Sequence, residues 1–310
     1  MDRAGETGIT EVPVASRYVS VVIPTHNRPG LLGDAVASVL TQDVPVEVIV
    51  VDDASIPAVA GLPAVDDPRV KVIRNEVAIG PTRARNLGVE LASGAFVAFL
   101  DDDDTWLPGK LSRCLEILDA ADGVGVVAHR TVFDARQANG MRSDVRVVTD
   151  PLTRFGLQQT PHLDGVVVDA RLAKEVGFDE SLDAAQDVDF IIELARKSSF
   201  AMVDDALALR GDDGEPSAIG IDRRIVARGR LRAKHPDVLY RDGPSRSFYH
   251  VRLGHLYRRA GDRGRAIRNF LDAIRYDPAQ GQAWRGIALT LLPISAVARL
   301  SVERRARAAR

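Results

Sequence analysis

Acidic residues are grouped at two places in the first half of the chain. Asp52 and Asp53 are adjacent, and Asp101 begins a run of four aspartates that ends at Asp104. Four adjacent carboxylates repel one another, so a divalent cation would stabilise those that face a common site. A site made of carboxylate oxygens, with phosphate oxygens of a ligand to complete it, suits Mg²⁺ or Mn²⁺. The alternative is a solvated acidic turn that caps a following helix near Thr105.

The segments that must position these carboxylates alternate between predicted strands and helices. Apolar residues at helical spacing predict a helix over 31–40, and good helix formers predict another over 81–91. Continuously apolar strands between helices predict an α/β domain with a mostly parallel sheet covered on both faces. Ligands of such sheets bind beyond the carboxyl ends of the strands, so both acidic groups and the loop 25–28 should meet there. Short runs rich in β-branched residues predict these strands, at 18–24, 46–51, 69–73 and 95–100.

The second half of the chain is less regular. Further strands are predicted at 124–128 and 165–168, and a helix begins near Phe190 after an acidic segment. Residues 211–216 break the composition, and nearly everything beyond them predicts helix. The expected division is a flexible N-terminus at 1–16, an α/β domain at 17–215 and an all-helical C-terminal region at 216–310.

The amino-acid composition excludes several classes of protein for this chain. The 310 residues are 45% hydrophobic, which suffices for a sizeable core. With 41 Lys+Arg and 43 Asp+Glu, the net charge of −2 argues against a general nucleic-acid binder. The single cysteine, Cys114, argues against an internal disulfide and a thiolate metal site, and fits a reducing compartment. Because neither a secretory signal nor an apolar stretch of about 20 residues is found, a cytoplasmic location is expected.

The near-neutral total charge hides a division along the chain. Residues 221–310 contain 21 Lys+Arg and 7 Asp+Glu, a net charge of +14, which leaves −16 for residues 1–220. The basic segment is expected to dock on the acidic domain, on a second subunit, on an anionic membrane or on a phosphate-bearing acceptor.

The C-terminal region carries two further patterns. Residues 253–278 fall close to one tetratricopeptide repeat, a pair of helices that should pack on the α/β domain or on a second copy of the chain. A peptide-binding scaffold is the alternative. Residues 288–310 join Leu, Ile and Val to an Arg-rich end, which predicts a helix lying on a membrane surface or docked on its own protein.

Four segments resemble the successive blocks of family 2 glycosyltransferases with the GT-A fold, a Rossmann-like fold. The resemblance covers about the first two thirds of the chain, and its blocks occur in order at residues 19–28, 48–55, 80–88 and 99–108. It implies an inverting enzyme that uses Mn²⁺ or Mg²⁺ and a nucleotide-sugar donor, usually a UDP-sugar. The acceptor would be a hydroxyl of a glycan, a glycolipid or a small molecule.

The resemblance also implies roles for residues of the donor site. Asp53 matches the aspartate that hydrogen-bonds the base, and Asp102 would lie near the ribose or the sugar. Asp101 and Asp103 form a D-x-D pair of which Asp103 is the more direct metal ligand, although four consecutive aspartates leave this register open by one position. Arg85 falls in the block near the diphosphate and sugar, with a surface-exposed helical face as the alternative. The loop that wraps the nucleotide is matched by Pro24, Thr25, Asn27 and Arg28.

A transferase of this kind also needs a base. Asp187 matches the family's aspartate that deprotonates the acceptor hydroxyl, and Gln186 stands where the family has Glu. The alternative role for Asp187 is a helix cap, and Asp189 should support the loop or cap the helix. Residues expected on the acceptor or sugar side are Arg83, Trp106, His162, Asp164 and Gln186. For His162 a plain loop role, and for Trp106 a packing role, remain open, and His129 fits a core position.

Two other functions compete with this interpretation. A sugar-phosphate nucleotidyltransferase would need a Gly-rich basic loop after the first strand, and residues 25–30 do not supply one. A non-catalytic assembly module built on the helical repeat would not need the acidic run or Asp187. Processive synthases carry a Gln-x-x-Arg-Trp block that we do not find, so addition of one or a few sugars is expected.

Overall fold

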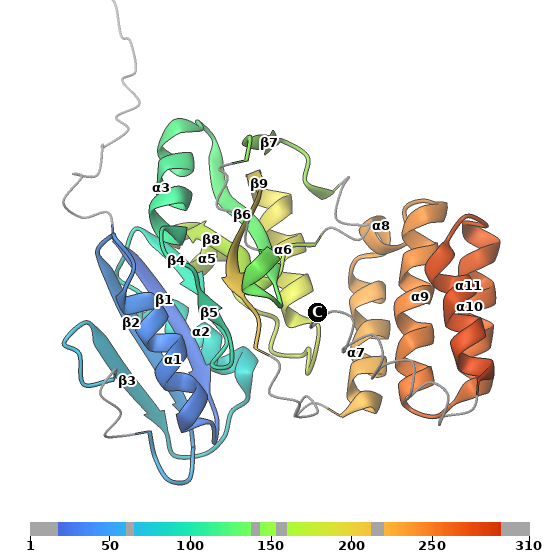
Figure 1. Ribbon diagram of the computed structural model, residues 1–310, viewed down its shortest axis with the longest axis horizontal. Coiled ribbons are helices and arrows are strands. Elements are labelled where there is room, and N and C mark those ends of the chain that lie inside the picture. The colour runs from blue at the N-terminus through green and yellow to red at the C-terminus, as the bar shows by residue number, and fades with distance from the viewer. Residues whose placement is uncertain (1–17, 60–64, 138–142, 153–159, 212–219, 293–310) are drawn as a thin grey trace, which may run out of the picture. The chain divides into compact units, whose positions relative to one another are not determined.

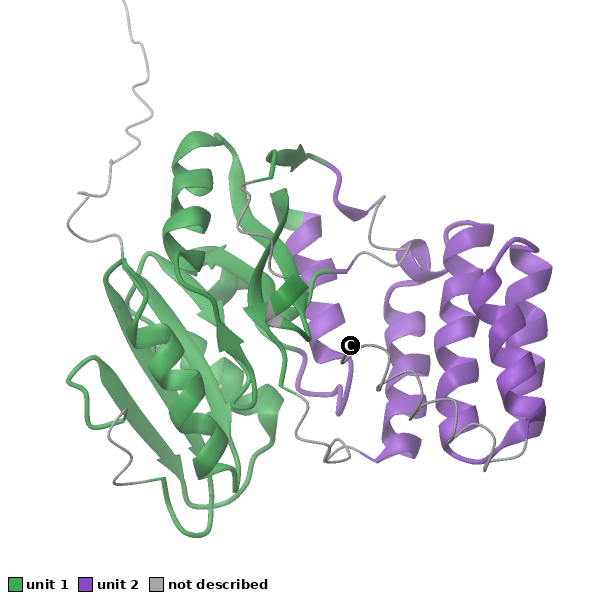
Figure 2. Cartoon of the chain, viewed as in Figure 1, with its two compact units in different colours: residues 1–149, 161–178, 197–214 green, residues 150–160, 179–196, 215–310 purple. Residues whose placement is uncertain are grey.

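The computed structural model describes residues 18–59, 65–137, 143–152, 160–211 and 220–292. The chain divides into two compact units, shown in different colours in Figure 2. The predicted flexible N-terminus at 1–16 lies outside the described residues, as does most of the predicted boundary at 211–216. The second unit takes residues from the middle of the chain as well as from its end. The first unit comprises residues 1–149, 161–178 and 197–214, and the second comprises 150–160, 179–196 and 215–310.

The first unit is built on one nine-stranded sheet in the order β3-β2-β1-β4-β8-β6-β9-β5, with β7 paired to β9 (Figure 1). The strands β3, β2, β1 and β4 are parallel, as predicted. Beyond β4 the sheet is mixed, because β8 is antiparallel to both β4 and β6, whereas β6 and β9 are parallel. The strands are β1 (Val19–Thr25), β2 (Val46–Asp53), β3 (Val70–Asn75), β4 (Phe96–Phe99), β5 (Thr105–Trp106), β6 (Val124–Val132), β7 (Arg146–Val148), β8 (Val166–Asp169) and β9 (Ser199–Leu209).

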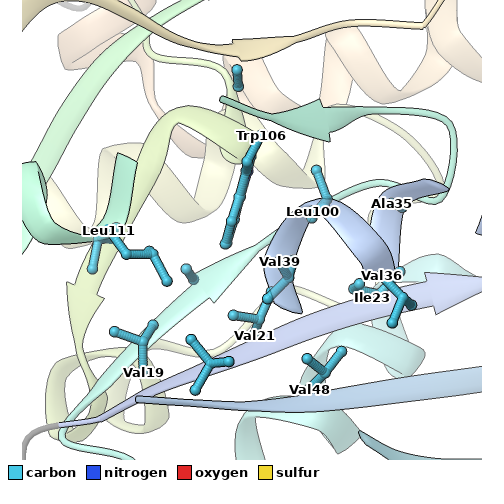
Figure 3. Close-up of a cluster of buried hydrophobic side chains, with 14 of the residues drawn as sticks. Val19, Val21, Ile23, Ala35, Val36, Val39, Val48, Leu100, Trp106 and Leu111 are labelled. Carbon is cyan, nitrogen blue, oxygen red and sulfur yellow. The ribbon is translucent and has the colours of Figure 1, made fainter. Parts of the chain in front are cut away.

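Helices cover both faces of this sheet. Residues of α1 (Pro29–Leu40) and α3 (Lys110–Ala120) share one buried hydrophobic cluster with alternate residues of β1, β2 and β4, as Figure 3 shows. The intervening residue Val22 of β1 points to the other face, because successive side chains of a strand alternate. There α2 (Pro81–Leu91) approaches so closely that a Cβ atom at Gly88 would lie 2.3 Å from Val22 Cγ1. Residues of α5 (Ala170–Val176) pack beside α2.

Three strands of this unit were not predicted. Thr105 and Trp106 form β5, which pairs with the end of β9, so the helix after the acidic run begins only at Lys110. Two acidic residues interrupt the apolar sequence pattern of the long strand β9, and β7 is only three residues long. The predicted strands at 124–128 and 165–168 are present within β6 and β8.

The second unit is helical. Its helices α9 and α10 form a hairpin that turns at Gly261, where φ is +81°. The Phe270 ring of α10 fits against two glycines, since a Cβ atom at Gly254 or Gly286 would lie within 2.8 Å of it. The tetratricopeptide resemblance stays a prediction, and most of residues 288–310 lies outside the described part. The helices are α6 (Gln186–Lys197), α7 (Ile221–Lys234), α8 (Pro236–Leu239), α9 (Gly243–Arg259), α10 (Arg263–Tyr276) and α11 (Gly281–Leu291).

The lengths and compositions of these helices show whether any of them could span a membrane. None of those in the described ranges is both long and apolar enough to cross a bilayer.

Candidate functional site

The loop after β1 and the acidic run after β4 meet at the carboxyl edge of the sheet. Thr25 Oγ1 donates a hydrogen bond to Asp102 Oδ2 at 2.7 Å. Arg28 Nη1 lies 3.0 Å from Asp103 Oδ2 and 3.4 Å from Asp102 Oδ1. These contacts confirm that residues 25–28 and the aspartates after β4 come together, although they are more than 70 positions apart in the chain.

The aspartates at the end of β2 have different surroundings. Asp53 Oδ1 accepts from the Ile79 backbone N–H and Oδ2 from that of Gly80, both at 2.8 Å. This carboxylate therefore shapes the turn that leads into α2. Asp52 is fully buried and accepts from backbone N–H groups and from Arg74 Nη1 at 2.6 Å. Asp52 thus holds the loop after β2, whereas Asp53 holds the turn before α2 and also accepts from Asn75 Nδ2 at 3.0 Å.

Strained backbone marks the predicted site segments. Among the described residues, three non-glycine residues have positive φ angles: Asn27 at 58°, Ala54 at 61° and Ala185 at 62°. Each is itself a predicted site residue or stands directly beside one. The Asn27 conformation is fastened by its side chain, whose Oδ1 accepts from the Ile56 backbone N–H at 2.7 Å. Such conformations persist only where the surroundings impose them, and they concentrate at functional sites.

The acidic run supplies a set of oxygen donors for a cation. Asp101, Asp103 and Asp104 each offer a carboxylate oxygen, and these atoms lie within 4.8 Å of one another. Asp104 belongs to a second such group with His162 and Asp164. Three carboxylates within this distance fit the hard, oxygen-binding cations Mg²⁺ and Mn²⁺. Asp104 was not among the predicted ligands, and the run of four aspartates was the signal that could have included it.

Asp164 connects this cluster to the turn before β8. Its side chain is fully buried, its Oδ1 accepts from the Asp101 backbone N–H at 3.1 Å, and its Oδ2 lies 2.5 Å from His162 Nδ1. The structure therefore places both residues beside the acidic run. The role of His162 in the site stays a prediction.

Burial and mutual repulsion shift the protonation of the cluster. Burial raises the pKa of Asp102 to about 6 and, with a hydrogen bond to Asp164, the pKa of Asp104 to about 10. Burial also works to raise the pKa of Asp164, but hydrogen bonds from His162 and Asp104 outweigh it and lower that pKa. The raised pKa favours the protonated form of Asp104 at neutral pH, and the lowered pKa favours the ionised form of Asp164 beside it. A cation would compete with the proton on Asp104, because metal ligands must be deprotonated.

Arg85 lies against the cluster from α2. Its Nη2 is 2.6 Å from Asp101 Oδ1, and its guanidinium carbon is 5.9 Å from the centroid of the Phe178 ring. Arg85 is buried, so the alternative of a surface-exposed helical face is wrong for it. Arg83 is exposed on the same helix. Asn86 binds the backbone of Phe178 through both side-chain atoms, which joins α2 to the segment after α5.

Trp106 and His129 lie inside the first unit. Trp106 is 3% exposed within the core cluster of Figure 3, and Lys110 Nζ lies 3.4 Å from its ring centroid. The packing role left open for Trp106 is the one that this geometry supports. His129 Nδ1 contacts the Arg130 carbonyl oxygen at 2.9 Å, and burial lowers the pKa of His129 to about 3. His129 therefore occupies the core position that was expected for it, and its lowered pKa favours the neutral ring.

The predicted base belongs to the second unit. α6 begins at Gln186, directly after the positive φ of Ala185, and Asp187 is half-buried in its first turn. Gln186 is buried, and its Oε1 has no hydrogen-bond partner within the described part of the chain. The charge of Asp187 acts on the guanidinium groups of Arg224 and Arg228 from α7.

Asp189 anchors α6 to the junction of α7 and α8. Its Oδ1 lies 2.7 Å from His235 Nε2 and 2.9 Å from Lys234 Nζ, and both Asp189 and His235 are buried. Asp189, Glu193 and His235 also satisfy the spacing of a metal group. Because Lys234 and Arg196 already approach the same atoms, this group is an ion-pair network. Nothing in the local sequence indicated His235, which is 46 positions away from Asp189.

Comparison with known proteins gives a consistent family. Residues 20–170 match the family model described as glycosyl transferase family 2. The succinoglycan biosynthesis protein ExoO of Rhizobium meliloti is 43% identical over 105 residues, which cover 33% of this chain and 30% of ExoO. The putative colanic acid biosynthesis glycosyl transferase WcaA of Escherichia coli is 31% identical over 191 residues, 57% of this chain and 65% of WcaA. The chain thus spans less than two thirds of either relative.

A third relative carries a substrate in its name. The GalNAc(5)-diNAcBac-PP-undecaprenol beta-1,3-glucosyltransferase of Campylobacter jejuni is 42% identical over 103 residues, which cover 32% of this chain and 33% of the relative.

Solved structures agree on the fold. TarS 1-349 of S. aureus in complex with UDP-GlcNAc superposes with a TM-score of 0.61 at 18% identity, over 88% of this chain and 90% of that one. The mannosyltransferase PcManGT of Pyrobaculum calidifontis, in complex with GDP-Man and Mn²⁺, gives 0.55 at 20% identity, over 92% and 79%. Residues 20–170 therefore form a family 2 glycosyltransferase domain built on the GT-A fold.

Proposed function

We propose that the protein is an inverting, metal-dependent glycosyltransferase that uses a nucleotide-sugar donor, a UDP-sugar. The acceptor is a hydroxyl group of a glycan, a glycolipid or a small molecule. One observation carries the proposal: within a family 2 domain, the loop 25–28 is joined directly to the aspartates after β4. The complexes of TarS with UDP-GlcNAc and of PcManGT with GDP-Man support a nucleotide-sugar as the donor.

The donor is bound in this proposal by residues of the first unit. Pro24, Thr25, Asn27 and Arg28 surround the nucleotide, and Asp53 accepts a hydrogen bond from the base. Asp102, held by Thr25 and Arg28, orients the ribose or the sugar. Arg85 is held near the acidic run by Asp101 and can donate hydrogen bonds to a phosphate.

A cation completes this site. Asp101, Asp103 and Asp104 would hold Mn²⁺ or Mg²⁺, and the complex of PcManGT with GDP-Man and Mn²⁺ supports that choice. The bound cation would neutralise negative charge on the leaving diphosphate. Asp164 and His162 position Asp104 and the Asp101 backbone from the inner side of the cluster.

The base is Asp187. It accepts the proton of the acceptor hydroxyl while the acceptor oxygen attacks the anomeric carbon, and the bond from that carbon to the diphosphate oxygen breaks. One such displacement inverts the anomeric configuration and requires no covalent intermediate. Gln186 is neutral where the family's acid would add a second negative charge, so it provides an amide at the start of α6 that can hydrogen-bond the acceptor.

Isothermal titration with a panel of nucleotide-sugars and Mn²⁺ tests the donor site. We expect saturable binding of a UDP-sugar that weakens at least about tenfold in Asp103→Ala and on chelation of the metal, because each removes a charge-assisted contact to the diphosphate. Asp43→Ala removes an exposed acidic side chain elsewhere in the same unit and should bind like the wild type. Binding that survives both Asp103→Ala and chelation contradicts the proposal.

A further inference from the structure

Two pairs of arginines lie on neighbouring helices of the second unit. Arg224 and Arg228 are one turn apart on α7, and Arg252 and Arg259 are two turns apart on α9. Residues at these spacings share a helix face. The two helices pack together, side by side in Figure 1, with the Tyr249 hydroxyl of α9 3.5 Å from the Arg228 carbonyl oxygen.

The four side chains, here called the arginine cluster, act on one another electrostatically. Burial and repulsion by Arg259 lower the pKa of Arg224, and burial and repulsion by Arg252 lower that of Arg228. Asp187 is the carboxylate that opposes both shifts. Val188, next to Asp187, packs in the same buried cluster as Leu231 of α7. Arg224 and Arg228 therefore bring positive charge to the start of α6 that one carboxylate does not balance.

Within the described part of the protein, only one carboxylate, that of Asp187, opposes the positive charges of Arg224 and Arg228. Both are half-buried, yet neither guanidinium group makes a hydrogen bond or an ion pair with any residue that the structure describes. Arg196 of the same unit, by contrast, is paired with Asp237 at 2.9 Å. Partly desolvated charges without partners are costly in a folded protein, and an anionic ligand would remove that cost.

The chemistry of the cluster indicates which anion it takes. A guanidinium group is a planar fork of donors that matches phosphate oxygens in pairs, and several of them together suit a phosphate or diphosphate group. The donor diphosphate already has its cation ligands and Arg85 in the proposed function. Arg224 and Arg228 of the cluster are instead the arginines on which the charge of Asp187 acts. Asp187 is the base that contacts the acceptor hydroxyl in the proposed function.

We propose that Arg224, Arg228, Arg252 and Arg259 bind a phosphate or diphosphate group of the acceptor substrate, so that the acceptor hydroxyl is presented to Asp187. The acceptor is then a phosphorylated sugar or a lipid diphosphate carrying a sugar. This inference rests on the proposed function, because Asp187 is the base only if the protein transfers a glycosyl group.

Inorganic pyrophosphate is a suitable probe when it is titrated into the full-length protein in the presence of EDTA. Without a cation, the aspartates after β4 repel an anion, so binding reports a basic site. We expect one equivalent to bind, and either Arg224→Gln or Arg228→Gln to weaken it about tenfold. Arg228→Lys keeps the charge but loses the planar fork and should fall between wild type and Arg228→Gln. Arg223→Gln, at an exposed position of the same helix, makes the same charge change and should leave the affinity unaltered.

Thermal unfolding separates ligand binding from a structural role. If the cluster serves a ligand, neutralising Arg224 or Arg228 removes repulsion, so the melting temperature should stay the same or rise. Pyrophosphate should raise the melting temperature of the wild type and of Arg223→Gln but not that of the double variant of Arg224 and Arg228. A lower melting temperature for both single variants, together with unaltered pyrophosphate affinity, would overturn the inference.

Two further measurements distinguish other occupants. If the double variant binds the UDP-sugar with Mn²⁺ at least tenfold more weakly than the wild type, the cluster serves the donor and the acceptor assignment is wrong. A second outcome would also make the assignment wrong. If the wild type but not the double variant binds phosphatidylglycerol vesicles, and pyrophosphate binds to neither protein, the cluster is a membrane contact. Failure to bind pyrophosphate while metal-dependent donor binding persists overturns this inference alone. Failure of the wild type to bind any nucleotide-sugar contradicts the proposed function instead.

Discussion

At the scale of single residues, the site is an arrangement of carboxylates whose partners decide their roles. Asp52 and Asp53 are adjacent but differ in their partners. Asp52 accepts hydrogen bonds from Arg74 and from backbone N–H groups, whereas Asp53 accepts from the backbone of the turn before α2. Asp104 and Asp164 are both buried, and burial and their proximity raise the pKa of Asp104 while hydrogen bonds lower that of Asp164. The residue type of an aspartate therefore does not identify it as a metal ligand, and the side chains and backbone groups around it must also be known.

The proposed base gives the sharpest prediction at this scale. Asp187→Asn keeps the shape of the side chain but cannot accept the acceptor proton, so transfer should fall by about 10²-fold to 10⁴-fold. Binding of the UDP-sugar with Mn²⁺, measured by calorimetry, should be unaltered. Asp183→Asn, at an exposed position shortly before α6, is the matched control and should transfer at the wild-type rate. Loss of donor binding in Asp187→Asn would show that the base lies elsewhere.

Much of the proposed donor site could be predicted at the residue scale, because its segments follow strands directly. The loop 25–28 and the acidic run were expected to meet, and they do. Partnerships across long sequence separations could not be predicted. Asp189 contacts His235 only because α6 packs on α7 and α8. Asp104 lies beside Asp164 only because the chain returns to the cluster before β8.

At the scale of elements, the parallel half of the sheet was predictable and the mixed half was not. β1 and β2 are apolar runs buried on both faces, which the pattern of a parallel strand requires. β9 carries Asp204 and Asp205 in its middle, and the second of these is buried by pairing with Arg113 at 3.1 Å. Such a strand lacks the regular alternation of apolar and polar residues by which a strand is predicted from sequence, because a distant arginine pairs with its buried carboxylate.

The close packing of α2 on β1 can be tested by adding a single methyl group between them. Gly88→Ala would place a Cβ atom 2.3 Å from Val22 Cγ1 in a fully buried position. We expect urea unfolding to show a loss of about 1–3 kcal/mol, because an overpacked core must shift its backbone. Gly33→Ala in α1 has no atom within 4 Å of the added Cβ and should instead stabilise by up to about 1 kcal/mol. Equal effects of the two substitutions would contradict the close packing of α2 on β1.

Glu47 of β2 gives a prediction with a defined pH range. Burial opposes its ionisation, but hydrogen bonds from Ser20 and Ser93 and from Lys71 outweigh this and lower the pKa of Glu47 from 4.5 to about 2. Because the folded pKa lies below the unfolded one, the carboxylate stabilises the fold above pH 4.5, and this contribution disappears as the pH falls towards 2.

We therefore expect Glu47→Gln to lower the free energy of unfolding by about 1–2 kcal/mol at pH 7, a figure reduced for solvent screening. The difference between variant and wild type, measured by urea unfolding, should shrink steadily between pH 4.5 and 2. Glu90→Gln, on the exposed face of α2, should alter stability little at any pH. A difference for Glu47→Gln that stays constant across this range would contradict the network around Glu47.

At the scale of the whole molecule, the charge division of the sequence acquires a chemical meaning. The acidic first part of the chain contains the proposed cation ligands, and the basic helices contain the arginine cluster beside the proposed base. Charge alone left four partners open for the basic segment, and the phosphate-bearing acceptor is the one that we propose. The proposed acceptor binding does not depend on the tetratricopeptide resemblance of residues 253–278.

The most direct test of the central claim is the product formed from a UDP-sugar. Wild-type protein with Mn²⁺ and a panel of UDP-sugars is analysed by chromatography for UDP, with water or an added sugar phosphate as acceptor. We predict that one donor releases UDP, that chelation of the metal stops the release, and that Asp103→Ala slows it at least about 100-fold. Release of pyrophosphate with a nucleoside monophosphate, or formation of UDP that is indifferent to both the metal and Asp103, would contradict the account.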